Sequence, residues 1–313
     1  MTIQEIYNLA IEMGIKFDLR GEERVKKNLA RLKEKYEKMD KEEKEDFDLE
    51  RLNNPYSDTR IHFDTGKDVK KILAGIDIEA GELLLADKIG GIDLIFSHHP
   101  MGKALANLDD VMHSQEEVLE TYGVPINVAE GLLKTKIEEV SRGINPINHY
   151  QEIDVAKILN LSLINVHTPA DNLVASFLKK EIEGKKPDYV EDVLKILKEI
   201  PEYKEAMKRG FGPRLFNGDP ENRCGKIAFV ELAGGTEGTP KIYEKLAIAG
   251  VGTVISMHQS EEHKKEAESA NINVVVAGHI SSDSLGVNLF LDELEKQGVE
   301  IIPCGGLIRI KRF

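Results

Sequence analysis

The 313-residue sequence contains 42 basic and 55 acidic residues, which gives a formal net charge of -13. An acidic chain of this kind argues against nonspecific nucleic-acid binding, which requires a basic surface. Its length suffices for one large domain or two ordinary ones. The only cysteines, Cys224 and Cys304, lack CxxC spacing, which indicates a reducing compartment and argues against a structural zinc ribbon.

Nothing in the sequence predicts contact with a membrane. The N-terminus lacks the basic region and apolar segment of a signal peptide. No run approaches the ~20 apolar residues of a membrane span. We therefore expect a cytoplasmic protein.

Residues 1–54 have the pattern of charged helices. Thr2 is a candidate N-cap, with Glu5 three residues later as in a capping box. The stretch 22–52 is dense in Lys and Glu and has a narrow apolar stripe, typical of a solvated helical hairpin packed on the body of the protein or on a partner subunit. A break at Pro55 predicts a helical extension over 1–54 and an α/β core over 55–313, as one body or as two interwoven lobes.

Strand and helix patterns alternate through the core. Strands are predicted at 72–78, 92–97, 162–166, 227–232, 253–256, 274–277 and 300–302. Helices are predicted at 79–89, within 111–160 and 172–209, and at 241–249, 261–270 and 287–296. This alternation predicts right-handed βαβ units and a largely parallel sheet with helices on both faces. No internal repeat is apparent in the sequence.

Three of the predicted strands end in side chains that can bind metals. These side chains are His98 and His99, then His167 and Asp171, and finally His279 and Asp283. In α/β proteins, ligands bind outside the carboxyl ends of the strands, so the three ends could build one site. Imidazole and carboxylate ligands suit zinc, iron, nickel or manganese.

Each pair also has a structural interpretation. His98 and His99 could be hydrogen-bonded turn histidines, and His167 a satisfied turn histidine. Asp171 could cap the helix that begins near Leu173. Asp283 lies where a helix macrodipole favours an acid.

The stretch from Phe229 to Pro240 reads as a strand, a glycine-rich turn and a helix with Pro240 in its first position. The exposed amides of Gly234, Gly235 and Gly238 could hold a phosphate or another anion. The alternative is a tight turn that packs the strand against the helix.

His258 and His263 follow another apolar strand. They are candidate proton carriers beside a metal site, or ordinary exposed histidines at a helix entry. We interpret the remaining histidines, His62, His113 and His149, as structural.

The combined pattern resembles the Nif-three-like dinuclear-metal-centre proteins, some of which are described as GTP cyclohydrolase type-two homologues. The matching elements are Ser97-His98-His99-Pro100, the turn from His167 to Asp171, the loop from Gly234 to Gly238, and Gly278-His279 with Asp283. The resemblance covers roughly residues 67–305. It implies a Nif-three-like α/β fold.

The resemblance also implies a site with two divalent ions, for which we expect zinc, iron or manganese. His99 and Asp171 would bind one ion, and His98 and His279 the other. The acid at Asp283 would bridge them, although the family usually carries Glu there, which is one methylene longer. Relatives form ring-like homo-oligomers, so the resemblance implies the same here.

The expected function is that of a metal-dependent hydrolase. Two ions would lower the pKa of a bridging water and make hydroxide available near neutral pH. Their charge favours a small anionic, phosphorylated or nucleotide-like substrate, and His263 or His167 could carry protons. The alternatives are a metal-binding interaction module without catalysis and a GTP cyclohydrolase-like activity.

Overall fold

The computed structural model describes all 313 residues and contains two separate β-sheets. The first sheet has the strand order β1-β4-β3-β2-β9 and the second β5-β8-β7-β6. The first consists of β1 (Arg60–Phe63), β2 (Lys71–Gly75), β3 (Leu94–Ser97), β4 (Ser162–Asn165) and β9 (Glu300–Cys304). The second consists of β5 (Arg214–Asn217), β6 (Lys226–Phe229), β7 (Val251–Ser256) and β8 (Asn273–Val276).

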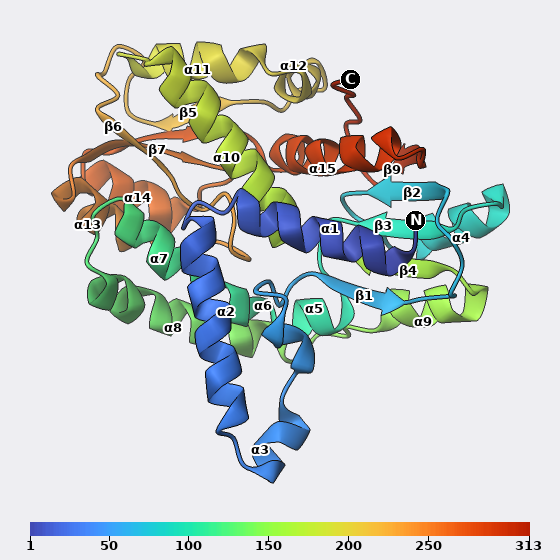
Figure 1. Cartoon of the computed structure of the whole chain (residues 1–313). Coiled ribbons are helices and arrows are strands. Elements are labelled where there is room, and N and C mark those ends of the chain that lie inside the picture. Colours follow the sequence, from blue (N-terminus) through green and yellow to red (C-terminus); the bar gives the residue numbers. More distant parts are fainter.

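Helices occupy most of the remaining chain (Figure 1). They are α1 (Ile3–Lys16), α2 (Glu22–Glu37), α3 (Lys41–Asp46), α4 (Ala80–Ile89), α5 (Gly102–Ala106), α6 (Leu108–Val111), α7 (Ser114–Thr121), α8 (Ile126–Ile144), α9 (Gln151–Leu159), α10 (Thr168–Lys185), α11 (Val190–Glu199), α12 (Pro201–Lys208), α13 (Ile242–Ile248), α14 (Glu261–Ser269) and α15 (His279–Lys296), with a 3₁₀ helix at Leu49–Leu52. None of them is both long and apolar enough to cross a membrane.

Four strands of each sheet share one topology, and the first sheet has an additional strand, β9, parallel to β2. In the first, the parallel strands β2, β3 and β4 are adjacent, and β1 pairs antiparallel with β4. In the second, β6, β7 and β8 are adjacent and parallel, and β5 pairs antiparallel with β8. The chain therefore contains a structural repeat of four strands. The sequence shows no corresponding internal repeat beyond the pattern of apolar strands.

The α/β class is confirmed, and each predicted strand is present within a few residues. The strands form two sheets, and β1 and β5 were not predicted. Both are short antiparallel edge strands whose side chains are mostly exposed or half-exposed, so neither has the apolar run that marks the central strands. Helix α15 begins at His279, well before the predicted start at residue 287.

Helix α1 begins as predicted, because Thr2 and Glu5 form both hydrogen bonds of a capping box. Its apolar face is part of the main core of the first sheet, where Ile3 and Ile6 are almost completely buried. Helix α2 buries only Val25, and α2 and α3 project away from the sheets (Figure 1). The N-terminal segment thus contains one core helix and two solvated ones; the domain boundary at residue 55 stays a prediction.

Helices α10 and α15 join the two halves. Helix α10 starts at the end of β4 in the first sheet, whereas α15 starts at the end of β8 in the second. The two helices pack so closely that a Cβ on Gly286 would lie 2.2 Å from the carbonyl oxygen of Ala170. This contact brings the N-terminal turns of α10 and α15 together.

Candidate metal centre

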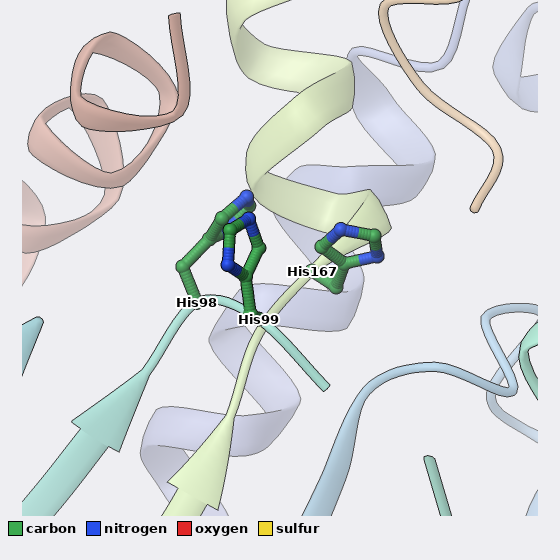
Figure 2. Close-up of side chains that lie close together, drawn as sticks. All are labelled: His98, His99 and His167. Carbon is green, nitrogen blue, oxygen red and sulfur yellow. The ribbon is translucent and has the colours of Figure 1, made fainter. Parts of the chain in front are cut away.

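The carboxyl ends of β3, β4 and β8 meet between the two sheets. His98 and His99 follow β3, and His167 is the N-cap of α10 after β4. Figure 2 shows these three imidazoles gathered beside the first turn of α10. His279 opens α15 after β8, and Gly278 before it has φ +106, a left-handed conformation in which other residues are strained.

Two buried carboxylates lie among these imidazoles. Asp171 lies in the first turn of α10, where the helix macrodipole favours negative charge, and Asp283 lies just after the first turn of α15. Asp171 Oδ1 lies 3.4 Å from His98 Nε2, and Asp171 Oδ2 lies 3.8 Å from His167 Nε2. Each oxygen of Asp171 therefore faces a different imidazole.

The two oxygens of Asp283 also face different imidazoles. Oδ1 lies 3.7 Å from His98 Nε2. Oδ2 lies 3.4 Å from His99 Nε2 and 3.5 Å from His279 Nε2. An ion on either side of Asp283 would thus find one carboxylate oxygen and at least one imidazole nitrogen.

Several of the inward-facing atoms have no hydrogen-bond partner although they are buried. These atoms are His98 Nε2, Asp171 Oδ1 and both carboxylate oxygens of Asp283. Buried polar groups in proteins are nearly always paired, and unpaired ones are costly. The donor set therefore fits divalent cations, which would satisfy these atoms at once.

The outer nitrogens of the imidazoles are held by acceptors. Nδ1 of His98 donates to the carbonyl oxygen of Val166 at 2.9 Å, because a carbonyl can only accept. Nδ1 of His99 lies 2.6 Å from Asp77 Oδ1, and Nδ1 of His167 lies 2.8 Å from Asp58 Oδ2. These contacts leave Nε2 of each neutral ring free to coordinate, as at known metal sites.

Burial governs the charges in this cluster. It lowers the pKa of His98 to about 3, so that this imidazole is neutral at physiological pH and its lone pair is available. Burial also raises the pKa of Asp171 to about 6. Burial lowers the pKa of His167 as well, but the carboxylates of Asp171 and Asp58 outweigh this effect and raise it to about 9. A cation between the acids would relieve the unfavourable burial of their negative charge.

Solved structures with a similar fold exist. A NIF3 superfamily protein from Sphaerobacter thermophilus superimposes with a TM-score of 0.71 and 29% sequence identity over 80% of this chain and 92% of that one. These structural neighbours support a NIF3-like family assignment for the chain. Reduced HcgD from Methanocaldococcus jannaschii shares the fold, with a TM-score of 0.53 and 18% identity over 84% of this chain and 94% of that one. No protein-family model and no curated protein matches the sequence.

The arrangement of the candidate ligands in this NIF3-like chain differs from the expected one. The resemblance paired His99 with Asp171 and His98 with His279. In the structure His98 lies beside Asp171, and His99 lies with His279 on Asp283 Oδ2. His98 Nε2 faces both Asp171 and Asp283, whereas His99 Nε2 faces Asp283. The shorter side chain of Asp283 nevertheless reaches both groups.

The glycine-rich loop forms part of the wall beside this centre. Gly235 lines the same cavity as His279 and Asp283. The Gly234 carbonyl instead accepts a hydrogen bond from Gln115, and the Gly238 amide donates to Glu231 Oε1 at 3.1 Å. The Gly238 amide is thus already bound to an anion of the protein itself. Pro240 does not begin the next helix, because α13 starts at Ile242.

The two predicted proton carriers have different positions. His167 lies within the cluster. His263 is buried in α14, with Nε2 3.1 Å from Glu231 Oε1 and Nδ1 3.3 Å from Glu237 Oε1, and it is absent from the cavity wall. His258 packs against His279, with 5.6 Å between the ring centroids.

Sequence analysis missed three acids near the centre: Asp58, Asp77 and Glu231. Asp77 and Glu231 each lie two residues beyond a strand, so the rule that ligands gather at strand ends could have indicated them. Asp58 lies in the loop before β1 and carries no such signal. It meets His167 only through the antiparallel pairing of β1 with β4.

Proposed function

We propose that this chain binds two divalent metal ions and is a metal-dependent hydrolase of a small anionic, phosphorylated or nucleotide-like substrate. The main support is the set of buried, unpaired oxygens on Asp171 and Asp283 that face free imidazole nitrogens. The structural similarity to a NIF3 superfamily protein supports the same conclusion. Zinc, iron and manganese suit this mixture of nitrogen and oxygen donors.

The distances suggest how the ligands divide. His98, Asp171 and Asp283 would hold one ion, and His99, His279 and Asp283 the other, since the donor atoms in each set lie within 4.8 Å of one another. Asp283 is then the bridging carboxylate. His167 is near enough to join His98 and His99 as a further ligand.

Two ions bound here would supply Lewis acidity, which makes water nucleophilic near neutral pH. The residues of the chain hold the reacting groups in place. Val166, Asp77 and Asp58 fix the orientation of the three imidazoles, which keeps the donor set preorganised. His167, held between Asp58 and Asp171, is the group placed to carry a proton at the centre.

Elemental analysis of the purified protein tests the metal centre. We expect about two divalent ions per chain, and their loss in His98→Ala and in His279→Ala, because each variant removes a ligand from a different set. His113→Ala is the matched control, since His113 is exposed and contacts only Glu116. Native protein without metal, or variants that keep it, would contradict the assignment.

The hydrolase activity requires its own assay. The metal-loaded protein and its His279→Ala variant should be compared on a panel of phosphoesters and cyclic amidines. Turnover that disappears in the variant supports hydrolysis. Turnover that persists without His279 excludes this centre as its source.

The projecting helices α2 and α3 favour a second candidate, a metal-binding interaction module without catalysis. Their surfaces are charged and almost entirely exposed, with Val25 as the one buried residue. Metal-loaded protein that turns over no member of the panel, and that yields no formate from GTP, would favour this function. A ring-like homo-oligomer remains part of either proposal, and light scattering of the metal-loaded protein would test it.

A further inference from the structure

Glu231 has an unusual backbone conformation. Its φ is +57, in the left-handed region that residues other than glycine rarely adopt. The other such residues are Asn160, Lys186 and Asn271, each at the C-terminal end of a helix, where a left-handed residue is common. Glu231 instead follows strand β6, so helix termination does not explain it. Strained residues of this kind concentrate at functional sites.

Only one of the two carboxylate oxygens of Glu231 has a hydrogen-bond partner. Its Oε1 accepts the Gly238 amide at 3.1 Å and lies 3.1 Å from His263 Nε2. Its Oε2 is buried and has no partner, and the whole side chain is only 2% exposed. Two contacts thus hold one oxygen in place and leave the other without a donor.

Glu231 lines the same cavity as the candidate ligands Asp171, His279 and Asp283. A ligand whose anionic group meets the metal centre would therefore extend beside this carboxylate. Another anion there would be repelled. An N–H group would supply the donor that Oε2 lacks, in a charge-assisted hydrogen bond.

We infer that Glu231 binds an N–H donor, such as an amine or amidine, carried by the same ligand whose anionic group meets the metal centre. The inference rests on the proposed function and narrows its substrate class to compounds that contain both groups. Glu231 then acts as a specificity residue in the wall of the cavity.

A matched pair of probes tests this assignment. Aminomethylphosphonate and ethylphosphonate have the same number of heavy atoms and differ in carrying an ammonium or a methyl group. Their dissociation constants should be measured by calorimetry on the metal-loaded protein. We expect the wild type to bind aminomethylphosphonate about tenfold or more tightly than ethylphosphonate, the effect of one hydrogen bond to a charged group.

Glu231→Gln should abolish this preference and keep both metal content and ethylphosphonate binding. Glu237→Gln is the matched control, because Glu237 belongs to the same loop and also contacts His263 but does not line the cavity. The control variant should keep the preference, which separates a local contact from the general attraction of an acidic protein for an amine.

Three results would overturn the inference. A wild type that binds two metals and ethylphosphonate without preferring the amine refutes the role of Glu231 but leaves the proposed function standing. A preference for the amine that survives in Glu231→Gln does the same. A wild type that binds neither metal nor either phosphonate refutes the proposed function, and the inference with it.

Discussion

At the scale of single residues, the candidate centre depends on side chains that are not themselves candidate ligands. Val166, Asp77 and Asp58 each accept a hydrogen bond from the outer nitrogen of an imidazole. They differ in exposure: the side chain of Asp77 is 60% exposed, whereas that of Asp58 is fully buried. A buried partner holds its imidazole more firmly, because water does not compete for the hydrogen bond.

Asp58→Asn should therefore lower metal affinity by about tenfold to a hundredfold, the usual effect of losing a carboxylate partner of a metal-binding histidine. The affinity can be measured by competition with a chelator, together with Tm to confirm folding. Asp77→Asn is the control, in which we expect a smaller loss because the contact is exposed. Equal metal affinities of the wild type and Asp58→Asn would show that metal binding does not depend on the hydrogen bond between His167 and Asp58.

The pKa of His62 predicts how the free energy of unfolding depends on pH. Burial lowers the pKa of His62 in the folded protein from 6.5 to about 4, and its Nε2 lies 2.8 Å from Asn165 Oδ1. The unfolded chain therefore binds this proton more readily, so the free energy of unfolding falls as the pH decreases from about 6.5 towards about 4. His62→Gln should remove part of this loss. The free energies of unfolding of the wild type and of His62→Gln can be measured by urea titration with chelator present, from neutral pH to about pH 4. The same pH dependence in both proteins would contradict the prediction.

At the scale of elements, α10 and α15 control the spacing of the two carboxylates. Each helix begins at the strand end of a different sheet, and each carries one of the two acids near its N-terminus. Their closest approach is at Gly286, where a Cβ would overlap the carbonyl group of Ala170, the residue before Asp171. The geometry of the centre is thus a consequence of helix packing as well as of strand ends.

Gly286→Ala should lower the free energy of unfolding by about 1–3 kcal/mol, because the added methyl forces the helices apart. It should also weaken metal binding, since Asp171 would move relative to Asp283. Gly184→Ala, at an open position on α10, should raise stability by about 0.5–1 kcal/mol through helix propensity. Chemical denaturation of both variants checks the prediction, and a stable Gly286→Ala protein with normal metal affinity would contradict it.

At the scale of the whole molecule, the candidate ligands connect two halves that have separate cores. His98, His99 and Asp171 follow strands of the first sheet, whereas His279 and Asp283 follow β8 of the second. Helix α10 packs its first turns into the core of the first sheet and its later turns into that of the second. Metal binding should therefore stabilise the contact between the halves.

Removal of metal should lower Tm. A ligand present at a hundred times its Kd stabilises the folded state by about 2.7 kcal/mol, and chelation removes this contribution. Differential scanning calorimetry with and without a chelator measures the shift. His279→Ala should unfold at the same temperature in both conditions, and a wild type insensitive to chelation would argue against bound metal.

The sequence by itself determined the α/β class, the central strands, the Thr2 capping box and the clustering of metal-capable side chains at strand ends. These features follow from local rules, because apolar runs make buried strands and parallel strands present their carboxyl ends to one edge. Only the tertiary structure decided that the strands form two sheets with a shared four-strand topology, which imidazole faces which carboxylate, and that Asp58 and Glu231 belong to the site. These features depend on edge-strand pairing and helix packing, which join residues far apart in the chain, and on the strained backbone of one residue. None of them leaves a periodic pattern in the sequence.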